Sequence, residues 1–259
     1  MKILFQLQTN RVPTISQFLL VIIFFLLSTG LGEANPTENK EKSYTTSPAK
    51  FELPKNLKVG LTYYFDTREY NTLNILTSLS KLPGDINLWG FSDLSGNQGS
   101  GNGRFDITRY FLEYRLTRSL FPDSQSALKG LVFEAEHNDS NGPDNDVLRL
   151  GLTFKHSIPF LPGPKSWLQW RYHPYETDGT GSQVSVILFL SLTERIFISG
   201  FADLNLENDR DNRWVVEPQI NFKINETFDL VLETRYNETE DVNKALDGFG
   251  LAGGLKVKF

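Results

Sequence analysis

The last fourteen residues of the 259-residue chain, 246–259 (LDGFGLAGGLKVKF), alternate in character from one residue to the next. Counting back from Phe259 to Phe249, every second residue is apolar or glycine, and the residues between them are Gly, Ala or Lys. Successive side chains of a β-strand point to opposite faces, so this pattern predicts a strand with one apolar face and one small or cationic face. Because chain ends usually fray, a strand that stays amphipathic to its last residue is expected to close a sheet.

The same alternation recurs upstream and predicts twelve β-strands in all. No segment has the 3.6-residue period of a helix. Pro174 and Pro218 fall inside two of the predicted strands, where each removes a hydrogen-bond donor and weakens the prediction. The predicted strands are 57–66, 71–80, 85–94, 105–117, 127–137, 146–156, 166–176, 182–192, 195–206, 213–223, 227–236 and 246–259.

The beginning of the chain has the features of a secretory signal peptide, which we place at 1–34. Lys2 and Arg11 precede a ten-residue apolar run, 18–27, that is too short to cross a bilayer as a helix. Residues 35–55 are polar and are predicted to be a flexible periplasmic lead-in, which leaves 56–259 for the domain that contains the twelve strands. An exported chain without cysteine is not a disulfide-stapled domain and has no thiolate chemistry.

Composition and charge narrow the class of protein further. The net charge is −5 and no basic cluster is present, which argues against a nucleic-acid partner. Aromatic residues make up 13% of the chain although the mean hydropathy is only −0.29. A β-barrel in a membrane reconciles the two values, because half of each strand faces the inside and is free to be polar. We predict no cofactor and no metal.

A β-sandwich also has alternating strands, so the choice between sandwich and barrel depends on other features. The predicted strand number is even, the strands are close to the ~10 residues of a tilted membrane strand, and aromatic residues lie at strand ends on the apolar face. We therefore predict an all-β fold, a 12-stranded antiparallel up-and-down transmembrane β-barrel. A monomer in the outer-membrane lipid is expected.

The closing strand resembles the C-terminal signal strand of bacterial outer-membrane β-barrels. That resemblance implies recognition by the barrel assembly machinery and an outer-membrane location. The residues that would carry the signal are Phe249, Leu251, Leu255, Val257 and Phe259.

If the apolar face meets lipid, the opposite face of every strand lines a lumen. This face is rich in charged residues, which must be paired across strands or wetted because unpaired burial costs several kcal/mol. Ion pairing and a narrow polar pore are both consistent with the pattern. The lumen aromatics are either space-filling or stacking surfaces for planar solutes. The predicted pore-lining residues are Tyr64, Trp89, Phe91, Arg109, Phe111, Glu113, Arg115, Glu134, Arg149, Arg171, Glu217, Glu233 and Arg235.

The region 71–116 (NTLNILTSLSKLPGDINLWGFSDLSG…RFDITRYFLEYRLT) resembles the Tsx-like nucleoside channels. It has a strand ending in a short turn, a strand with aromatic residues and Gly, a long loop, and a strand containing Glu113 and Arg115. The resemblance implies a twelve-stranded outer-membrane barrel that passes small polar solutes, nucleosides among them. The nucleoside-binding residues of that family have no residue-by-residue match here.

The run HNDSNG, from His137 to Gly142, suggests an alternative, because it resembles a motif of outer-membrane phospholipase A. A serine hydrolase needs its histidine within hydrogen-bond reach of the serine. His137 and Ser140 are three residues apart, which in a regular strand places them on opposite faces. We therefore predict a turn over 138–145. The acids in and beside this turn either bind calcium weakly or are solvated, and they are Asp139, Asp144 and Asp146. A third alternative is a plugged structural barrel without transport.

Overall fold

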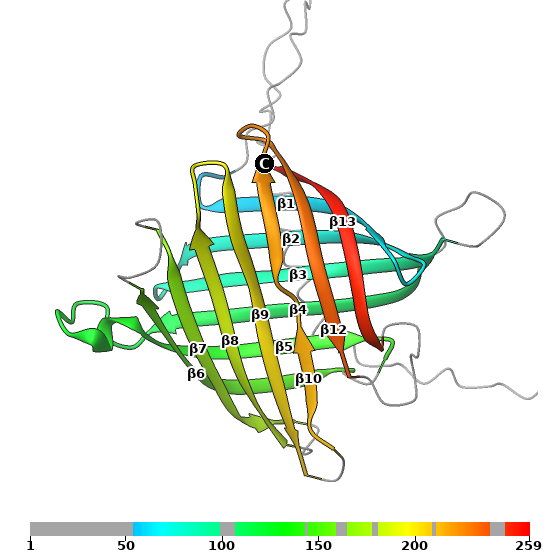
Figure 1. Ribbon diagram of the computed structural model, residues 1–259. Coiled ribbons are helices and arrows are strands. Elements are labelled where there is room, and N and C mark those ends of the chain that lie inside the picture. The colour runs from blue at the N-terminus through cyan, green and yellow to red at the C-terminus, as the bar shows by residue number, and fades with distance from the viewer. Residues whose placement is uncertain are drawn as a thin grey trace, which may run out of the picture. The chain divides into compact units, whose positions relative to one another are not determined.

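The computed structural model describes residues 54–98, 107–142, 145–158, 165–177, 181–208, 211–238 and 247–259. The predicted signal peptide and nearly all of the predicted lead-in lie outside these residues. The described part of the chain is almost entirely β-sheet (Figure 1). It contains no helix that is long and apolar enough to cross a membrane.

Thirteen strand segments form one sheet, and every pairing in it is antiparallel. β1 pairs with β2 on one side and with β13 on the other, so the sheet closes on itself (Figure 1). The segments are β1 Leu57–Asp66, β2 Tyr70–Leu82, β3 Ile86–Asn97, β4 Ile107–Ser119, β5 Leu131–Ser140, β6 Val147–Ser157, β7 Trp167–Glu176, β8 Gly181–Ser191, β9 Ile196–Glu207, β10 Arg213–Val216, β11 Gln219–Lys223, β12 Phe228–Asn237 and β13 Gly248–Lys258.

β10 and β11 are two halves of one strand, because both lie between β9 and β12. The interruption covers Glu217 and Pro218, and a proline cannot donate a ladder hydrogen bond. The molecule is therefore a closed, twelve-stranded antiparallel barrel, and the predicted fold class is confirmed. Pro174 is tolerated within β7 because the β6–β7 register shifts beside it, between Leu150 and Leu152.

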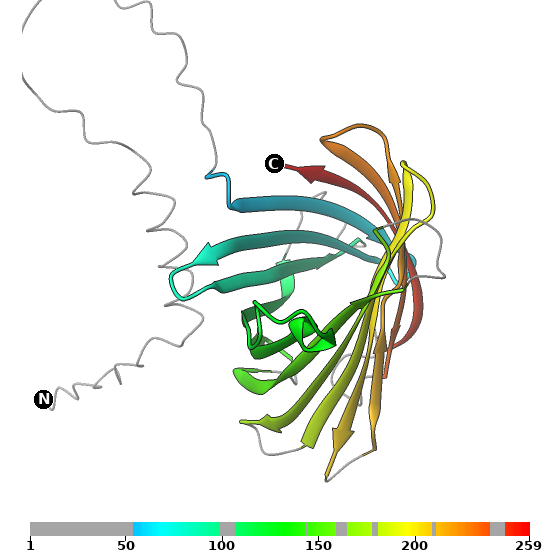
Figure 2. The same ribbon diagram turned by 90° about the vertical axis from the view of Figure 1, so that its left-hand side faces the viewer.

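Two of the wrongly predicted boundaries have a clear local explanation. Residues 127–130, predicted as the start of a strand, form the 3-10 helix η1 Ala127–Gly130 (green in Figures 1 and 2), because the Ser126 side chain accepts a hydrogen bond from the Leu128 N–H and caps it. The predicted turn over 138–145 begins too early, because β5 continues in unbroken register with β4 as far as Ser140, opposite Phe111.

The two faces of the barrel wall have opposite chemistry. Tyr64 on the inner face of β1 is 3% exposed, and the neighbouring Phe65 on the outer face is 62% exposed. Among the described residues, six hydrophobic side chains are buried against 26 polar or charged ones, the reverse of a water-soluble protein. The exposed outer face carries large apolar side chains, among them Phe65, Leu116, Phe133, Leu152, Trp170, Tyr172, Trp214, Ile220, Phe222, Leu230, Leu232, Phe249, Leu251, Leu255 and Phe259.

The inner face of β13 consists of small residues at the level where two bulky side chains enter the lumen. A Cβ at Gly254 would lie 2.8 Å from Cδ1 of Tyr64, and a Cβ at Gly250 would lie 2.8 Å from Cζ of Arg68. Ala252, between the two glycines, is fully buried. The small face predicted from the sequence therefore leaves the space that Tyr64 and Arg68 occupy.

Gly200, on β9, is the residue that faces the interruption between β10 and β11. Its φ is +149°, and a Cβ there would lie 2.6 Å from Cα of Pro218 and would also clash with the Glu217 carbonyl oxygen. We expect Gly200→Ala to lower the free energy of unfolding by at least about 1–2 kcal/mol. Urea titration of the lipid-inserted barrel measures this change. Gly253→Ala is the matched control, because nothing lies within 4 Å of its added Cβ, and an equal loss in both variants would contradict the expectation.

Candidate functional site

The inside of the barrel contains a cavity of about 540 Å³ to which all twelve strands contribute. Its wall is electrically balanced, with five acidic and five basic side chains. The acids are Asp93, Glu113, Glu134, Glu217 and Glu233, and the bases are Arg115, Lys155, Arg171, Arg235 and Lys256. Aromatic residues and amides make up half of the other residues on the wall.

Ten of the thirteen residues predicted to line a pore lie on the wall of this cavity. The other three, Arg109, Phe111 and Arg149, are inner-face residues that lie outside it. Arg109 stacks over the Tyr70 ring at 5.1 Å, the Phe111 ring lies 5.8 Å from that of Phe91, and Arg149 is buried in an ion pair. The ten are Tyr64, Trp89, Phe91, Glu113, Arg115, Glu134, Arg171, Glu217, Glu233 and Arg235.

A row of alternating charges crosses four neighbouring strands, and we call it the β4–β7 network. Arg115, Glu136, Arg149 and Glu176 are direct cross-strand partners in the register of β4, β5, β6 and β7. Arg115 Nε donates to Glu136 at 2.7 Å, Arg149 Nη1 donates to Glu136 at 3.1 Å, and Arg149 Nε donates to Glu176 at 2.9 Å. Each buried charge thus has an opposite charge beside it, which compensates for its lost hydration.

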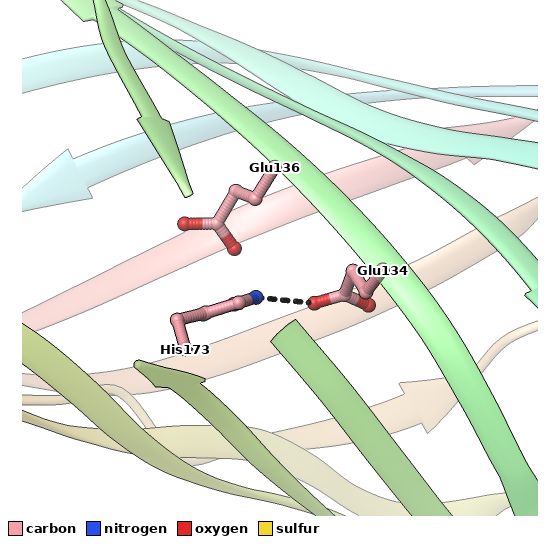
Figure 3. Close-up of side chains that lie close together, drawn as sticks. All are labelled: Glu134, Glu136 and His173. Carbon is pink, nitrogen blue, oxygen red and sulfur yellow. Dashed lines mark ion pairs between the residues drawn. The ribbon is translucent and has the colours of Figure 1, made fainter. Parts of the chain in front are cut away.

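Glu134 extends the β4–β7 network one step along β5. Its carboxylate forms an ion pair with Arg171 Nε at 2.5 Å and lies 3.2 Å from His173 Nε2 (Figure 3). Glu113 forms an ion pair with Arg115. From β9, the buried Asp203 interacts electrostatically with Arg171. Glu134 and His173 are at most 1% exposed, so the side chains of the network pack closely against one another here.

Glu134, Glu136 and His173 have the composition of a metal site, and their ligand atoms lie within 4.8 Å of one another (Figure 3). Their carboxylates are, however, already bonded to Arg115, Arg149 and Arg171. Three guanidinium groups would repel a divalent cation at this position. The arrangement is therefore better described as an ion-pair network than as a metal centre.

A second cluster, the β12 network, lies around Arg235. Arg235 pairs with Glu233 on the same strand, lies 3.4 Å from Asp66 of β1, and stacks over the Tyr64 ring at 4.7 Å. Asp66 also binds Arg68, at 2.8 Å. This network joins the first strand of the barrel to its penultimate one.

Aromatic rings form two groups on the inner face. The Trp89 and Phe91 rings lie 5.8 Å apart, and the Trp167 and Phe189 rings stack at 6.0 Å. Lys155 Nζ lies 3.7 Å above the Trp167 ring, a cation–π contact. The lumen wall therefore offers apolar faces beside charged groups, a combination that suits solutes with both characters.

The structure separates the two residues of the hydrolase alternative. His137 Nε2 lies 2.9 Å from Asp146, whereas the Ser140 hydroxyl accepts a hydrogen bond from the Gly142 N–H. β5 has no bulge between them, so His137 and Ser140 project from opposite faces. Asp144, one of the acids considered for calcium, lies outside the described residues.

The sequence-based prediction of pore-lining residues missed some residues of the cavity wall and of the two networks. Asp93 is the next alternate residue after Trp89 and Phe91 in the same strand. The alternation therefore could have identified it as an inner-face acid. Asp66 and Glu176 end their strands, where alternation alone does not separate a wall residue from a loop residue. Arg68 lies in the β1–β2 turn, and no sequence pattern places it in the lumen.

Comparisons with known proteins agree with the architecture. No protein-family model and no curated protein matches the chain. Solved structures that share the fold include "KdgM porin" and "KdgM porin in complex with disordered oligogalacturonate". Each is 10% identical with a TM-score of 0.50 and covers 78% of this chain and 99% of its own. A NanC porin, 9% identical over 78% of this chain, has a TM-score of 0.48. At 10% identity the likeness to the two KdgM structures shows the fold alone, a porin-type barrel.

Proposed function

We propose that this chain is an outer-membrane channel for the diffusion of small polar solutes. The observation that carries the proposal is the inversion of the closed barrel, with an apolar exposed outer face and a charged inner face around a cavity of about 540 Å³. A belt of large apolar side chains matches the hydrocarbon core of a membrane, and a polar lumen matches a water-filled path. The resemblance of its fold to porins supports the same reading.

The charge balance of the lumen favours solutes that are neutral overall. One solved porin of this fold is in complex with disordered oligogalacturonate, a polyanion. Here Arg115, Arg171 and Arg235 are each paired with a carboxylate, so they offer little net attraction to a polyanion. Passage of nucleosides, implied by the Tsx resemblance, stays a prediction within this proposal, supported only by the aromatic faces on the wall.

Conductance across planar lipid bilayers tests the channel. We expect small, discrete current steps and a reversal potential close to zero in a salt gradient, because the cavity wall carries equal numbers of acids and bases. Folding is checked in parallel by the heat-modifiable gel shift that β-barrels show. A fully folded sample that stays silent at all voltages would indicate the plugged structural barrel instead.

We further propose that the chain is a monomer that is delivered after cleavage of residues 1–34 and inserted by the barrel assembly machinery. The apolar residues of the closing strand support insertion by that machinery, because Phe249 and Phe259 are 64% and 62% exposed on the outer face. Phe259→Ala is expected to reduce the assembled fraction in cells several-fold without changing the single-channel conductance of the barrels that do form. The heat-modifiable band in membrane fractions measures assembly.

Phe121→Ala is the control for that experiment, since Phe121 is an exposed aromatic residue in the β4–β5 connection and not part of the closing strand. Normal assembly of the Phe259 variant, or an equal loss in both variants, would contradict a role for Phe259 as a signal.

A further inference from the structure

Some of the charged side chains on the cavity wall form ion pairs with one another, and others do not. Arg115, Arg171 and Arg235 are each paired with a carboxylate. Within the described residues, Lys155 and Lys256 line the cavity without an ion pair. Two of the acids, Asp93 and Glu217, also form no ion pair within these residues, although both interact electrostatically with Arg235. The cavity therefore retains two ammonium groups and two carboxylates for a ligand.

These residual charges are separated along the barrel axis. Lys155 and Lys256 each lie two residues from the ends of β6 and β13, at Ser157 and Lys258, so both are near the mouth where the chain ends. Asp93 lies seven residues into β3, and Glu217 lies in the interruption between β10 and β11. At ~3.3 Å per residue in a tilted strand, the two levels are on the order of 10 Å apart.

Neighbouring groups hold these charges in place. Asp93 accepts a hydrogen bond from Asn74 Nδ2 at 2.7 Å, and Lys256 Nζ donates to Asn221 at 3.4 Å. Lys155 lies over Trp167, as described above. Groups that are already positioned lose less conformational entropy when a ligand binds.

Between the two levels the wall carries apolar rings. Trp89, Phe91 and Phe201 line the cavity there, and their faces can pack against an apolar side chain. A ligand that fits this wall has a cation at one end, an anion at the other about 10 Å away, and an apolar group between them. An extended tripeptide spans about 10 Å.

We infer that the cavity binds short zwitterionic peptides, with the ammonium group at the level of Asp93 and Glu217 and the carboxylate at the level of Lys155 and Lys256, which lie on different walls of the barrel. The inference rests on the proposed function, since the peptide is a small polar solute that reaches the site through the lumen. Short zwitterionic peptides are the substrate class that the residual charges of the cavity select.

Isothermal titration calorimetry on the folded, detergent-solubilised barrel tests the inference without requiring conductance. The probe is glycyl-phenylalanyl-glycine, compared with its N-acetylated form, its C-amidated form and the doubly blocked peptide. We expect each blocked end to weaken binding about fivefold to tenfold, because each removes one ion pair with the wall. Equal affinities for all four peptides, or no binding of any, would overturn the inference.

Two variants test which end of the peptide binds at which charged side chains. Lys155→Gln is expected to weaken binding of the free and N-acetylated peptides but not of the C-amidated one, which has no carboxylate. Glu217→Gln is expected to weaken binding of the free and C-amidated peptides but not of the N-acetylated one. Lys129→Gln and Glu226→Gln, at exposed positions outside the cavity, are matched controls and should bind as the unaltered chain does. A uniform loss for all peptides in the Lys155 or Glu217 variant would contradict the assignment.

Failure of this inference and failure of the channel are distinguishable. Current steps in bilayers without preference for the zwitterion would leave the channel in place and overturn the peptide site. Tight zwitterion binding in a barrel that never conducts would support the site and contradict the channel.

Discussion

Replacing Glu136 by leucine is expected to lower the free energy of unfolding by about 3–5 kcal/mol, the largest effect among the changes considered. Glu136 is 1% exposed and lies between two guanidinium groups, with Arg115 at 2.7 Å and Arg149 at 3.1 Å. Its removal leaves two buried positive charges side by side. The urea midpoint of the lipid-inserted barrel, followed by tryptophan fluorescence, measures the loss.

Glu194→Leu is the control, because Glu194 is exposed in the β8–β9 turn and has no described ion pair. Its effect should stay within about 0.5 kcal/mol. A loss below about 1 kcal/mol for the Glu136 variant would mean that water compensates the two arginines. The same experiment therefore reports whether the lumen is wet at the β4–β7 network.

Leu232→Arg is expected to destabilise the barrel by about 2–4 kcal/mol if the outer face lies in hydrocarbon. Leu232 is in the middle of β12 and is 51% exposed on that face. At a position equally exposed to water, the same arginine would hardly change the free energy of unfolding. A large loss of stability at Leu232 would therefore indicate that the outer face lies in the membrane. Urea titration in lipid vesicles measures it.

Phe228→Arg is the matched control for depth, because Phe228 is the first residue of the same strand and lies on the same face. Near the interface the expected cost is only about 0–1 kcal/mol. Equal costs at the two positions would contradict a hydrocarbon belt around the centre of the barrel.

The architecture was predictable because period-two alternation is a local property. The first predicted strand, 57–66, coincides with β1, and the tenth, 213–223, spans β10 and β11 with its weakness correctly located at Pro218. The sequence-based prediction is wrong where polar residues that are typical of turns lie within a strand. Asn138 and Ser140 have turn chemistry, yet they extend β5, because in a barrel the inner face accepts polar residues throughout.

The pairing of the lumen charges could not be read from the sequence. Arg115 meets Glu136 only because the β4–β5 register sets them opposite each other, and that register depends on where β4 ends and η1 begins. The sequence therefore predicts which residues face inward but not which of them neutralise one another. The residual charges at Lys155 and Glu217, on which solute choice is proposed to depend, emerge only after that pairing is known.

The small inner face of β13 also bears on how the barrel is finished. Asp66 and Arg235 are 169 residues apart in the chain, so their contact forms only when the seam between β1 and β13 is made, an event that must overcome the entropy of closing a very long loop. Until then two sheet edges stay open to intermolecular pairing, and Arg235 lacks the carboxylate of Asp66. Tyr64 packs against Gly254 in the same step. The complete β12 network therefore forms only in a barrel that has closed.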